Sequence, residues 1–191
     1  LAYLKMDSTW QGNVGSELKA IHDNRIVDLA IVAPAFPKMG RSVFNGQLLI
    51  RGKSDSQLLQ EKLRDQGIEK LSHISTRQLE MTVEELLELI IDLHTQGINT
   101  ITCDATSDEE LSTIALLIEK LTAIYGLSVL PVGSAGLAEH ISGNQSDSDT
   151  SRMVIVPSPV IAIIGSENSV THDQLDVALR VELLDELDGN R

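Results

Sequence analysis

Residues 5–15 place several groups that can bind an anion between an apolar run and a helical pattern. They read Lys-Met-Asp-Ser-Thr-Trp-Gln-Gly-Asn-Val-Gly, so a cation, a carboxylate, two hydroxyls and two glycines follow in close order. This order predicts a strand, a polar turn and a helix start, where backbone N–H groups lack partners and the helix dipole is positive. Such a junction suits a carboxylate or a phosphate. An ordinary capped helix start uses the same residue types and is an equal alternative.

A second turn of this kind follows a later aliphatic run. Residues 127–132 predict a buried strand, and Gly133, Ser134 and Gly136 then open a helical pattern. Their N–H groups and hydroxyl could contact the same ligand as the first turn. A single glycine-rich turn is weak evidence by itself.

Arg41 is the third candidate, and it follows a segment that cannot form regular structure. Pro34, Phe36 and Pro37 come directly after the strand-like run 27–33, at a strand end where open α/β sheets place their ligands. An arginine in a rigid loop can hold a carboxylate or a phosphate through two parallel hydrogen bonds. A solvated surface arginine is the alternative.

The order of the elements predicts a fold that can bring these turns together. Aliphatic runs typical of strands buried on both faces alternate with helical patterns. We expect an α/β fold with three layers, in which helices cover both faces of a mainly parallel sheet, followed by the start of a second α/β domain. Because the carboxyl ends of parallel strands share one edge, Asp7, Arg41 and Ser134 should meet around one small anion.

Local signals mark several element boundaries. Asn45–Gly46 predicts the turn of a β-hairpin within 43–51, and Thr82 and Ser107 predict the N-caps of two helices. A further helical pattern covers 57–66.

Three other kinds of residue have weaker claims to chemistry. Asp104 ends a predicted strand, where a carboxylate can orient a hydroxyl or a metal, or can simply bind the following turn. Cys103 lies in an apolar run and is expected to be a buried small hydrophobe. The five histidines show no metal-ligand spacing and are interpreted as surface residues of helices and strands.

The composition of the chain excludes several partners. The 191 residues carry a net charge of −13 with scattered basic residues, which argues against nucleic acid. No apolar run approaches the roughly 20 residues of a membrane helix, and no signal core follows a basic start. We therefore expect a cytoplasmic protein without a membrane partner. A single cysteine excludes an internal disulfide.

Five separated motifs extend over nearly the whole chain. They are 7–15, Ala33–Pro37 with Gly40–Arg41, Asp104–Ala105, Gly133–Ala138 and Gly165–Ser166. In content and order they resemble the motifs of the four-carbon acid sugar kinases, the threonate, erythronate and 3-oxo-tetronate kinases.

This resemblance implies an ATP-dependent kinase that phosphorylates a hydroxyl of a four-carbon sugar acid, with ATP and Mg²⁺ as cofactors. Asp7 is one candidate to accept the proton of the attacking hydroxyl, in competition with an Asp-Asp motif of the family that is absent here. The implied substrate-binding residues are Lys5, Ser8, Thr9, Gln11, Gly12, Asn13, Arg41, Gly133, Ser134 and Gly136. Ser166 is the implied ATP contact, and no residue is assigned to a metal.

Two departures from the family pattern affect this assignment. Gln11 stands where the family usually has arginine, and loss of this fixed charge is expected to weaken phosphate or carboxylate binding by about 1–3 kcal/mol if the contact is buried. We therefore expect the choice of substrate to differ from that of the family. Near 52–54 the family has a longer loop, and we interpret the short connection as the omission of a mobile lid over the substrate.

The resemblance also divides the chain. We expect a sugar-acid-binding domain over 1–141 that lacks the family's N-terminal segment, a polar linker over 142–157, and the truncated start of a nucleotide-binding domain over 158–191. This chain alone would then be inactive.

Two other functions stay open. The chain could be a non-catalytic sugar-acid-binding or interaction module, or an unrelated nucleotide-dependent oxidoreductase. The oxidoreductase is least favoured because no Gly-x-Gly-x-x-Gly motif follows a strand. The expected partners are the sugar acid and ATP, and a homodimer is compatible with the sequence.

Overall fold

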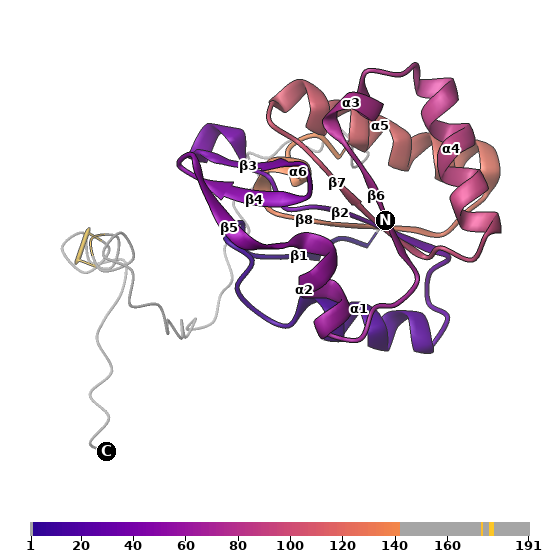
Figure 1. The fold of residues 1–191 in the computed structure, drawn as a ribbon, viewed down its shortest axis with the longest axis horizontal. Coiled ribbons are helices and arrows are strands. Elements are labelled where there is room, and N and C mark those ends of the chain that lie inside the picture. The colour runs from indigo at the N-terminus through magenta and orange to yellow at the C-terminus, as the bar shows by residue number, and fades with distance from the viewer. Residues whose placement is uncertain (1, 142–172, 174–175, 178–191) are drawn as a thin grey trace, which may run out of the picture. The chain divides into compact units, whose positions relative to one another are not determined.

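Five parallel strands form the central sheet of the molecule, in the order β1-β8-β2-β7-β6 (Figure 1). The computed structural model describes residues 2–141, 173, 176 and 177. Its central strands are β1 (Leu4–Lys5), β2 (Leu29–Ala33), β6 (Leu71–Ile74), β7 (Thr100–Cys103) and β8 (Val129–Gly133). Every residue of β2, β7 and β8 is buried, which explains their continuous aliphatic character.

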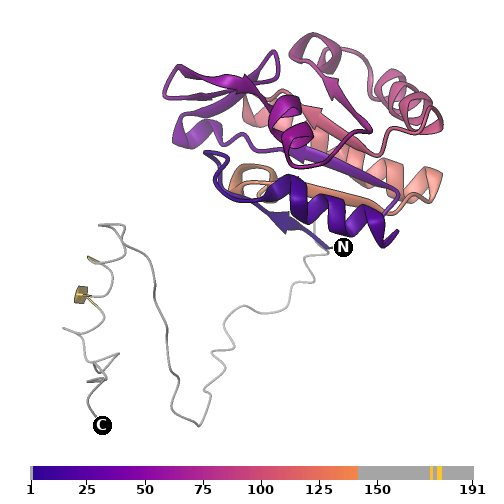
Figure 2. The ribbon, with the colours of Figure 1, turned by 60° about the horizontal axis from the view of Figure 1, so that its bottom comes forward.

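Helices cover both faces of this sheet. The helices α1 (Val14–Asp23) and α2 (Leu59–Asp65) lie on one face, and α4 (Val83–Thr95) and α5 (Asp108–Tyr125) lie on the other (Figures 1 and 2). Short turns complete the layer structure, namely η1 (Pro37–Met39), α3 (Thr76–Leu79) and α6 (Ala135–Ala138). The prediction of a mainly parallel sheet between two helical layers is confirmed.

The predicted caps fix where the two long helices begin. Thr82 accepts a hydrogen bond from the backbone N–H of Glu85 (3.3 Å), and Ser107 accepts one from that of Glu110 (3.2 Å). In each case the glutamate side chain returns a bond to the cap residue, which completes a capping box. Both predictions are confirmed.

A small antiparallel sheet interrupts the parallel pattern after β2. It consists of β3 (Arg41–Phe44), β4 (Gln47–Ile50) and β5 (Lys53–Leu58). The predicted hairpin turn at Asn45–Gly46 is confirmed, with φ values of 51° and 74° that suit a two-residue turn.

The sequence prediction is wrong at the next element. Residues 57–58 belong to β5, and the helix that was expected over 57–66 begins only at Leu59. Residues 53–58 form a strand because they pair with β4. Their side chains are mostly exposed, so the sequence shows no alternating apolar pattern that would predict a strand. Arg51 and Gly52 form the turn between β4 and β5, and the longer loop expected near 52–54 stays a prediction.

The chain connections diverge at the carboxyl ends of β1 and β8. The chain leaves β1 toward α1 on one face, whereas it leaves the neighbouring β8 toward α6, which packs against α5 on the other face. Neighbouring strands whose connections diverge in this way form a topological switch point, where α/β sheets bind their ligands.

The chain separates into two compact units, Leu1–Ser146 and Asp147–Arg191. In the second unit, Asp173, Asp176 and Val177 are helical and exposed. The predicted linker over 142–157 and Ser166 lie outside the described residues, so the domain boundaries stay predictions. None of the described helices is long and apolar enough to cross a membrane.

Candidate functional site

The turn after β1 and the turn after β8 lie side by side at the switch point. Lys5 is in register with Gly133, and the backbone N–H of Met6 donates to the carbonyl of Gly133 (2.9 Å). Lys5 is exposed, and its Nζ donates to the carbonyl of Met6 (2.8 Å). The ammonium group therefore lies at the edge where both turns begin.

Asp7 is exposed and organises the first turn through its own side chain. Its Oδ1 accepts the backbone N–H of Thr9 (2.8 Å) and the Thr9 hydroxyl, while its carbonyl accepts the N–H of Trp10 (3.1 Å). Partial burial raises the pKa of Asp7, but the bonds from Thr9 and the N–H of Gln11, with the charge of Lys5, bring the net pKa below its ordinary value. Asp7 is therefore an anion at neutral pH.

The following residues lead from this turn into α1. Ser8 is partly exposed, Gln11, Gly12 and Asn13 are exposed, and Gly12 has a φ of 110°. Asn13 is the N-cap of α1, although its side chain makes no capping bond. The predicted contact residues of this segment therefore remain accessible to a ligand.

A side chain of the protein itself occupies part of the α1 N-terminus. Gln66, just after α2, accepts the backbone N–H of Gly15 through Oε1 (2.6 Å), and its Nε2 donates to the carbonyl of Gly12 (3.4 Å). A Cβ at Gly15 would lie 2.5 Å from the Cβ of Gln66, so glycine is required for this approach. Sequence reasoning missed Gln66 because 51 residues separate it from Gly15.

The second turn is tightly bound to the end of β2. Ser134 is buried; its hydroxyl donates to the carbonyl of Ala35 (2.8 Å) and accepts the backbone N–H of Gly136 (3.1 Å). A Cβ at Gly136 would overlap the Ala35 carbonyl and approach Phe36, so only glycine fits there. The Ser134 hydroxyl is thus engaged in joining α6 to β2.

Arg41 is connected to the same edge through Phe36. The two residues exchange both backbone hydrogen bonds, at 2.8 and 3.1 Å. The Arg41 guanidinium donates to the carbonyl of Met39 (2.7 Å), and its buried Nε has no hydrogen-bond partner in the described part of the chain. Contacts from Met6 to Gly133, from Ser134 to Ala35 and from Phe36 to Arg41 therefore connect all three predicted elements at one edge of the sheet.

Asp104, at the end of β7, is fully buried, and the structure explains why. Its carboxylate accepts the backbone N–H groups of Asn45 (2.9 Å), Gly46 (2.9 Å) and Thr76 (3.0 Å), and His73 Nε2 lies 3.2 Å from Oδ1. Asp104 thus attaches the β3–β4 hairpin and α3 to the central sheet. The interpretation of His73 as a surface residue is wrong, because its side chain is only 16% exposed.

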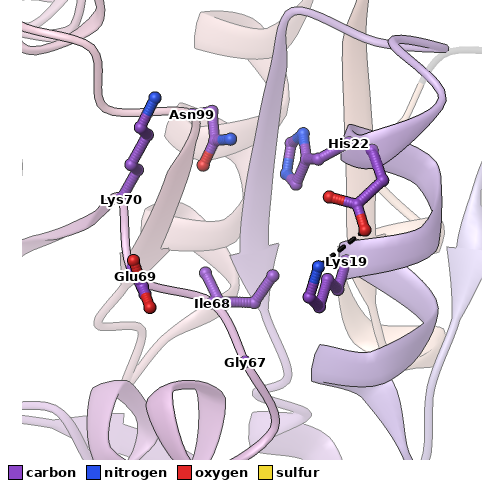
Figure 3. A pocket seen from close by; sticks show the side chains of 8 residues that line it. Lys19, His22, Gly67, Ile68, Glu69, Lys70 and Asn99 are labelled. Atoms are coloured by element: carbon purple, nitrogen blue, oxygen red, sulfur yellow. Dashed lines mark hydrogen bonds and ion pairs between the residues drawn. The ribbon is translucent and has the colours of Figure 1, made fainter.

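A cavity of about 340 Å³ lies near the amino ends of β6 and β7, at the opposite ends of the strands from the two turns (Figure 3). Its residues end α1 or precede β6 and β7, and they are Lys19, His22, Asp23, Gly67, Ile68, Glu69, Lys70 and Asn99. Lys19 and Asp23 form an ion pair at 2.6 Å. No predicted site residue lines this cavity.

Cys103 and the acidic residues offer little to a metal. Cys103 is buried, as predicted. Burial is the main cause of the raised pKa of its thiol, and the negative charge of Asp104 raises this pKa further. Within the residues that the structure describes, no group of three or more His, Cys, Asp or Glu side chains could hold a metal ion.

Comparison with known proteins gives one family match and several curated relatives. Residues 1–141 match the model of the sugar-binding N-terminal domain. The chain is 26% identical to a 3-oxo-tetronate kinase of Pseudomonas savastanoi, an alignment that covers 94% of this chain and 46% of the relative. It is 28% identical to a D-threonate kinase of Salmonella typhimurium, over 97% of this chain and 45% of the relative. The chain therefore spans somewhat less than half the length of these relatives.

Solved structures show the same fold. A Bordetella bronchiseptica protein of the DUF1537 family, solved as a domain-swapped dimer with bound citrate, is 25% identical with a TM-score of 0.58. The match covers 73% of this chain and 35% of that protein. A Haemophilus influenzae protein is 22% identical with a TM-score of 0.61, over 73% of this chain and 36% of that one.

Proposed function

The chain belongs to the family of sugar-binding N-terminal domains, and from this premise we propose that it is the sugar-acid-binding part of an ATP-dependent kinase. The reaction would transfer a phosphoryl group to a hydroxyl of a four-carbon sugar acid of the threonate, erythronate or 3-oxo-tetronate type. Two curated relatives are named 3-oxo-tetronate kinase and D-threonate kinase, which supports this substrate class. Because the chain spans 46% of the first of them, the activity is proposed for the whole protein.

One observation supports the proposed site most directly. The Asp7 turn and the Gly133–Gly136 turn adjoin at a topological switch point, through the bond from Met6 to Gly133. Exposed polar groups of the first turn and the Lys5 ammonium lie at this edge. A small polyhydroxy acid needs this mixture of a cation, hydroxyls and hydrogen-bond acceptors.

We assign Asp7 to a substrate hydroxyl. A carboxylate whose pKa is lowered binds protons weakly, so it is better suited to accept and orient an O–H group than to remove its proton. Orientation of the reacting hydroxyl is a large part of what a phosphoryl transfer requires from a protein. Lys5 and Arg41 are the cations proposed for the substrate carboxylate.

ATP and Mg²⁺ are assigned to parts of the protein other than residues 2–141. Mg²⁺ is commonly held by one or two carboxylates together with the nucleotide phosphates, so it is expected to accompany the nucleotide. Ser166, the predicted ATP contact, lies outside the described residues. The roles proposed for residues 2–141 therefore concern the sugar acid alone.

A second candidate function follows from Gln11. This residue is exposed and neutral where the family signature has arginine, so the protein could bind a sugar acid without phosphorylating it. Such a binding module would keep the turns that surround Asp7 and Gly133. The two functions differ in whether ATP is consumed.

A coupled assay of ADP release by the full-length protein, with D-threonate, D-erythronate and 3-oxo-tetronates as substrates, tests the proposal. A kinase should release ADP only when one of these acids is present. Binding of an acid by calorimetry without ADP release would favour the binding module instead. Absence of both binding and turnover with every acid would contradict the proposed function.

A further inference from the structure

Tyr3 contacts the second turn from the segment that leads to the first. Its hydroxyl donates to the carbonyl of Ser134 (2.6 Å), across 131 positions of the sequence. The Tyr3 ring is partly buried against the hydrophobic core. Burial raises the pKa of the Tyr3 hydroxyl, and the backbone of Ala138 lowers it only in part, so the group stays protonated and keeps its donor.

Gly133 leaves the space that this contact requires. A Cβ at position 133 would lie 2.7 Å from the Tyr3 hydroxyl and 2.7 Å from the carbonyl of Ala33. Both distances are shorter than real Cβ contacts, so glycine lets Tyr3 and the end of β2 approach the same backbone position. The sequence predicts Gly133 as a ligand contact, and its packing against Tyr3 is a second reason for its small size.

The pairing of β1 with β8 is short, so the bond from Tyr3 matters for the relative position of the two turns. β1 lies at the edge of the sheet and pairs with β8 at two positions, of which the last is Lys5 opposite Gly133. Strand pairing therefore stops before the second turn, whereas Tyr3 bonds to Ser134 inside it. Tyr3 thus fixes the second turn relative to the segment that carries the first.

The distance between the two turns determines which ligand can contact both. Neighbouring strands lie about 4.8 Å apart, and the ligand must reach across this spacing. A four-carbon sugar acid carries its carboxylate and hydroxyls along a chain that can reach both turns, whereas the two-carbon acid glycolate can engage only one. We propose that Tyr3 is a positioning residue, which sets the distance between the turns through Ser134 and so favours a four-carbon acid over a shorter one. This inference rests on the proposed function, because it requires a sugar acid between the turns.

NMR titration of the full-length protein with D-threonate, D-erythronate and glycolate tests this role. Tyr3→Phe keeps the ring and removes the hydroxyl. It should weaken binding of the preferred four-carbon acid by about 10-fold, the size of one lost hydrogen bond, and leave glycolate binding unchanged. A loss of stability alone would not change the ratio of the two affinities.

Tyr125→Phe is the matched control, because it removes the hydroxyl of an exposed tyrosine at the end of α5. Its affinities should equal those of the unmodified protein. In Tyr3→Phe the four-carbon acid should still shift the backbone resonances of residues 5–11 but no longer those of 133–136. This result decides the role of Tyr3 even where glycolate binds too weakly to measure.

A second readout uses the unmodified protein and does not depend on the folding of any variant. The preferred four-carbon acid should shift the resonances of both segments, and shifts in only one of them would contradict the role of Tyr3. If no four-carbon acid binds the unmodified protein, the proposed function itself fails. If an acid binds but Tyr3→Phe binds it equally tightly, or loses glycolate by the same factor, the role of Tyr3 is wrong and the proposed function stands.

Discussion

Asp7 and Asp104 both follow parallel strands of one sheet, at the same edge, yet they have opposite surroundings. Asp7 is exposed and binds only its own turn, whereas Asp104 is 0% exposed and accepts backbone N–H groups from the β3–β4 hairpin and from Thr76. A carboxylate at a strand end is therefore not a ligand site by position alone. Its role depends on how many donors from neighbouring segments already bind it.

The sheet topology explains this difference. β7 lies inside the sheet, and the hairpin covers its end through a bridge between Val43 and Ala105, whose backbone N–H groups donate to each other's carbonyls at 2.8 and 3.0 Å. β1 is an edge strand that pairs with β8. Asp104, beside the hairpin, is bound by donors from neighbouring segments and stabilises the fold, whereas Asp7, at the switch point, is exposed, as its proposed role toward the substrate requires.

The largest expected effect is the loss of stability in Asp104→Ala. Removal of this carboxylate leaves the buried N–H groups of Asn45, Gly46 and Thr76 without their acceptor, so the free energy of unfolding should fall by about 3–5 kcal/mol. Urea denaturation measures this change. Asp7→Ala is the matched comparison and should cost about 1 kcal/mol or less, since it breaks one exposed turn. Equal losses in the two variants would remove the distinction between the residues.

Asp7→Asn should show the reverse pattern, with activity lost and stability kept. An amide accepts a hydrogen bond from a hydroxyl more weakly than a carboxylate does, so kcat/KM of the full-length protein should fall by about 100-fold, equivalent to about 2.7 kcal/mol. Steady-state ADP release measures the loss. Asp23→Asn removes an exposed carboxylate beside the cavity near the amino ends of β6 and β7 and should retain full activity. Normal turnover by Asp7→Asn would contradict the role assigned to Asp7.

Gln66→Ala tests how far the Asp7 turn depends on distant support. The substitution removes the acceptor of the Gly15 N–H and should lower the free energy of unfolding by about 1 kcal/mol, as for the loss of a helix cap. Thermal unfolding of Gln66→Ala and of Gln60→Ala, a control within α2, measures this loss. The account of the α1 N-terminus is wrong if the Gln60 variant is the less stable of the two.

The smallest expected effect is the pH dependence of the Asp104 contribution. Burial raises the pKa of Asp104, but the contacts with His73, Gly46 and Thr76 bring the net pKa below its ordinary value. A lowered pKa in the folded state stabilises the protein above the unfolded pKa of about 3.9, and the stabilisation disappears as the pH falls through the folded pKa.

Urea unfolding of the unmodified protein and of Asp104→Asn between neutral pH and about pH 2.5 measures this dependence. The stability difference between the two proteins should be constant near neutral pH and should shrink below about pH 4. A difference that grows on acidification would contradict the assigned direction.

The central fold is predictable because its signals are local. Continuous burial gives β2 and β8 their aliphatic sequences, and the caps at Thr82 and Ser107 act within three residues of themselves. β5 is not predictable in this way, because its mostly exposed side chains follow its pairing with β4 and not a core-facing period.

The candidate site is predictable only in part, for the same reason. The turns near Asp7 and Gly133 can be recognised from their residue types. The hydrogen bonds that decide the role of Asp104, however, come from residues 28 to 59 positions away. No local sequence pattern reveals that the Ser134 hydroxyl is engaged, or that the Trp10 indole is buried without a hydrogen-bond partner among the described residues. Long-range packing determines which polar groups remain available.

Chemical-shift mapping of the full-length protein with D-threonate or D-erythronate tests the central claim most directly. The account predicts that the backbone resonances of residues 5–11 and 133–136 shift together on binding, while those of Lys19, Lys70 and Asn99 around the opposite cavity stay unchanged. Shifts confined to the cavity residues, with the two turns unaffected, would contradict it.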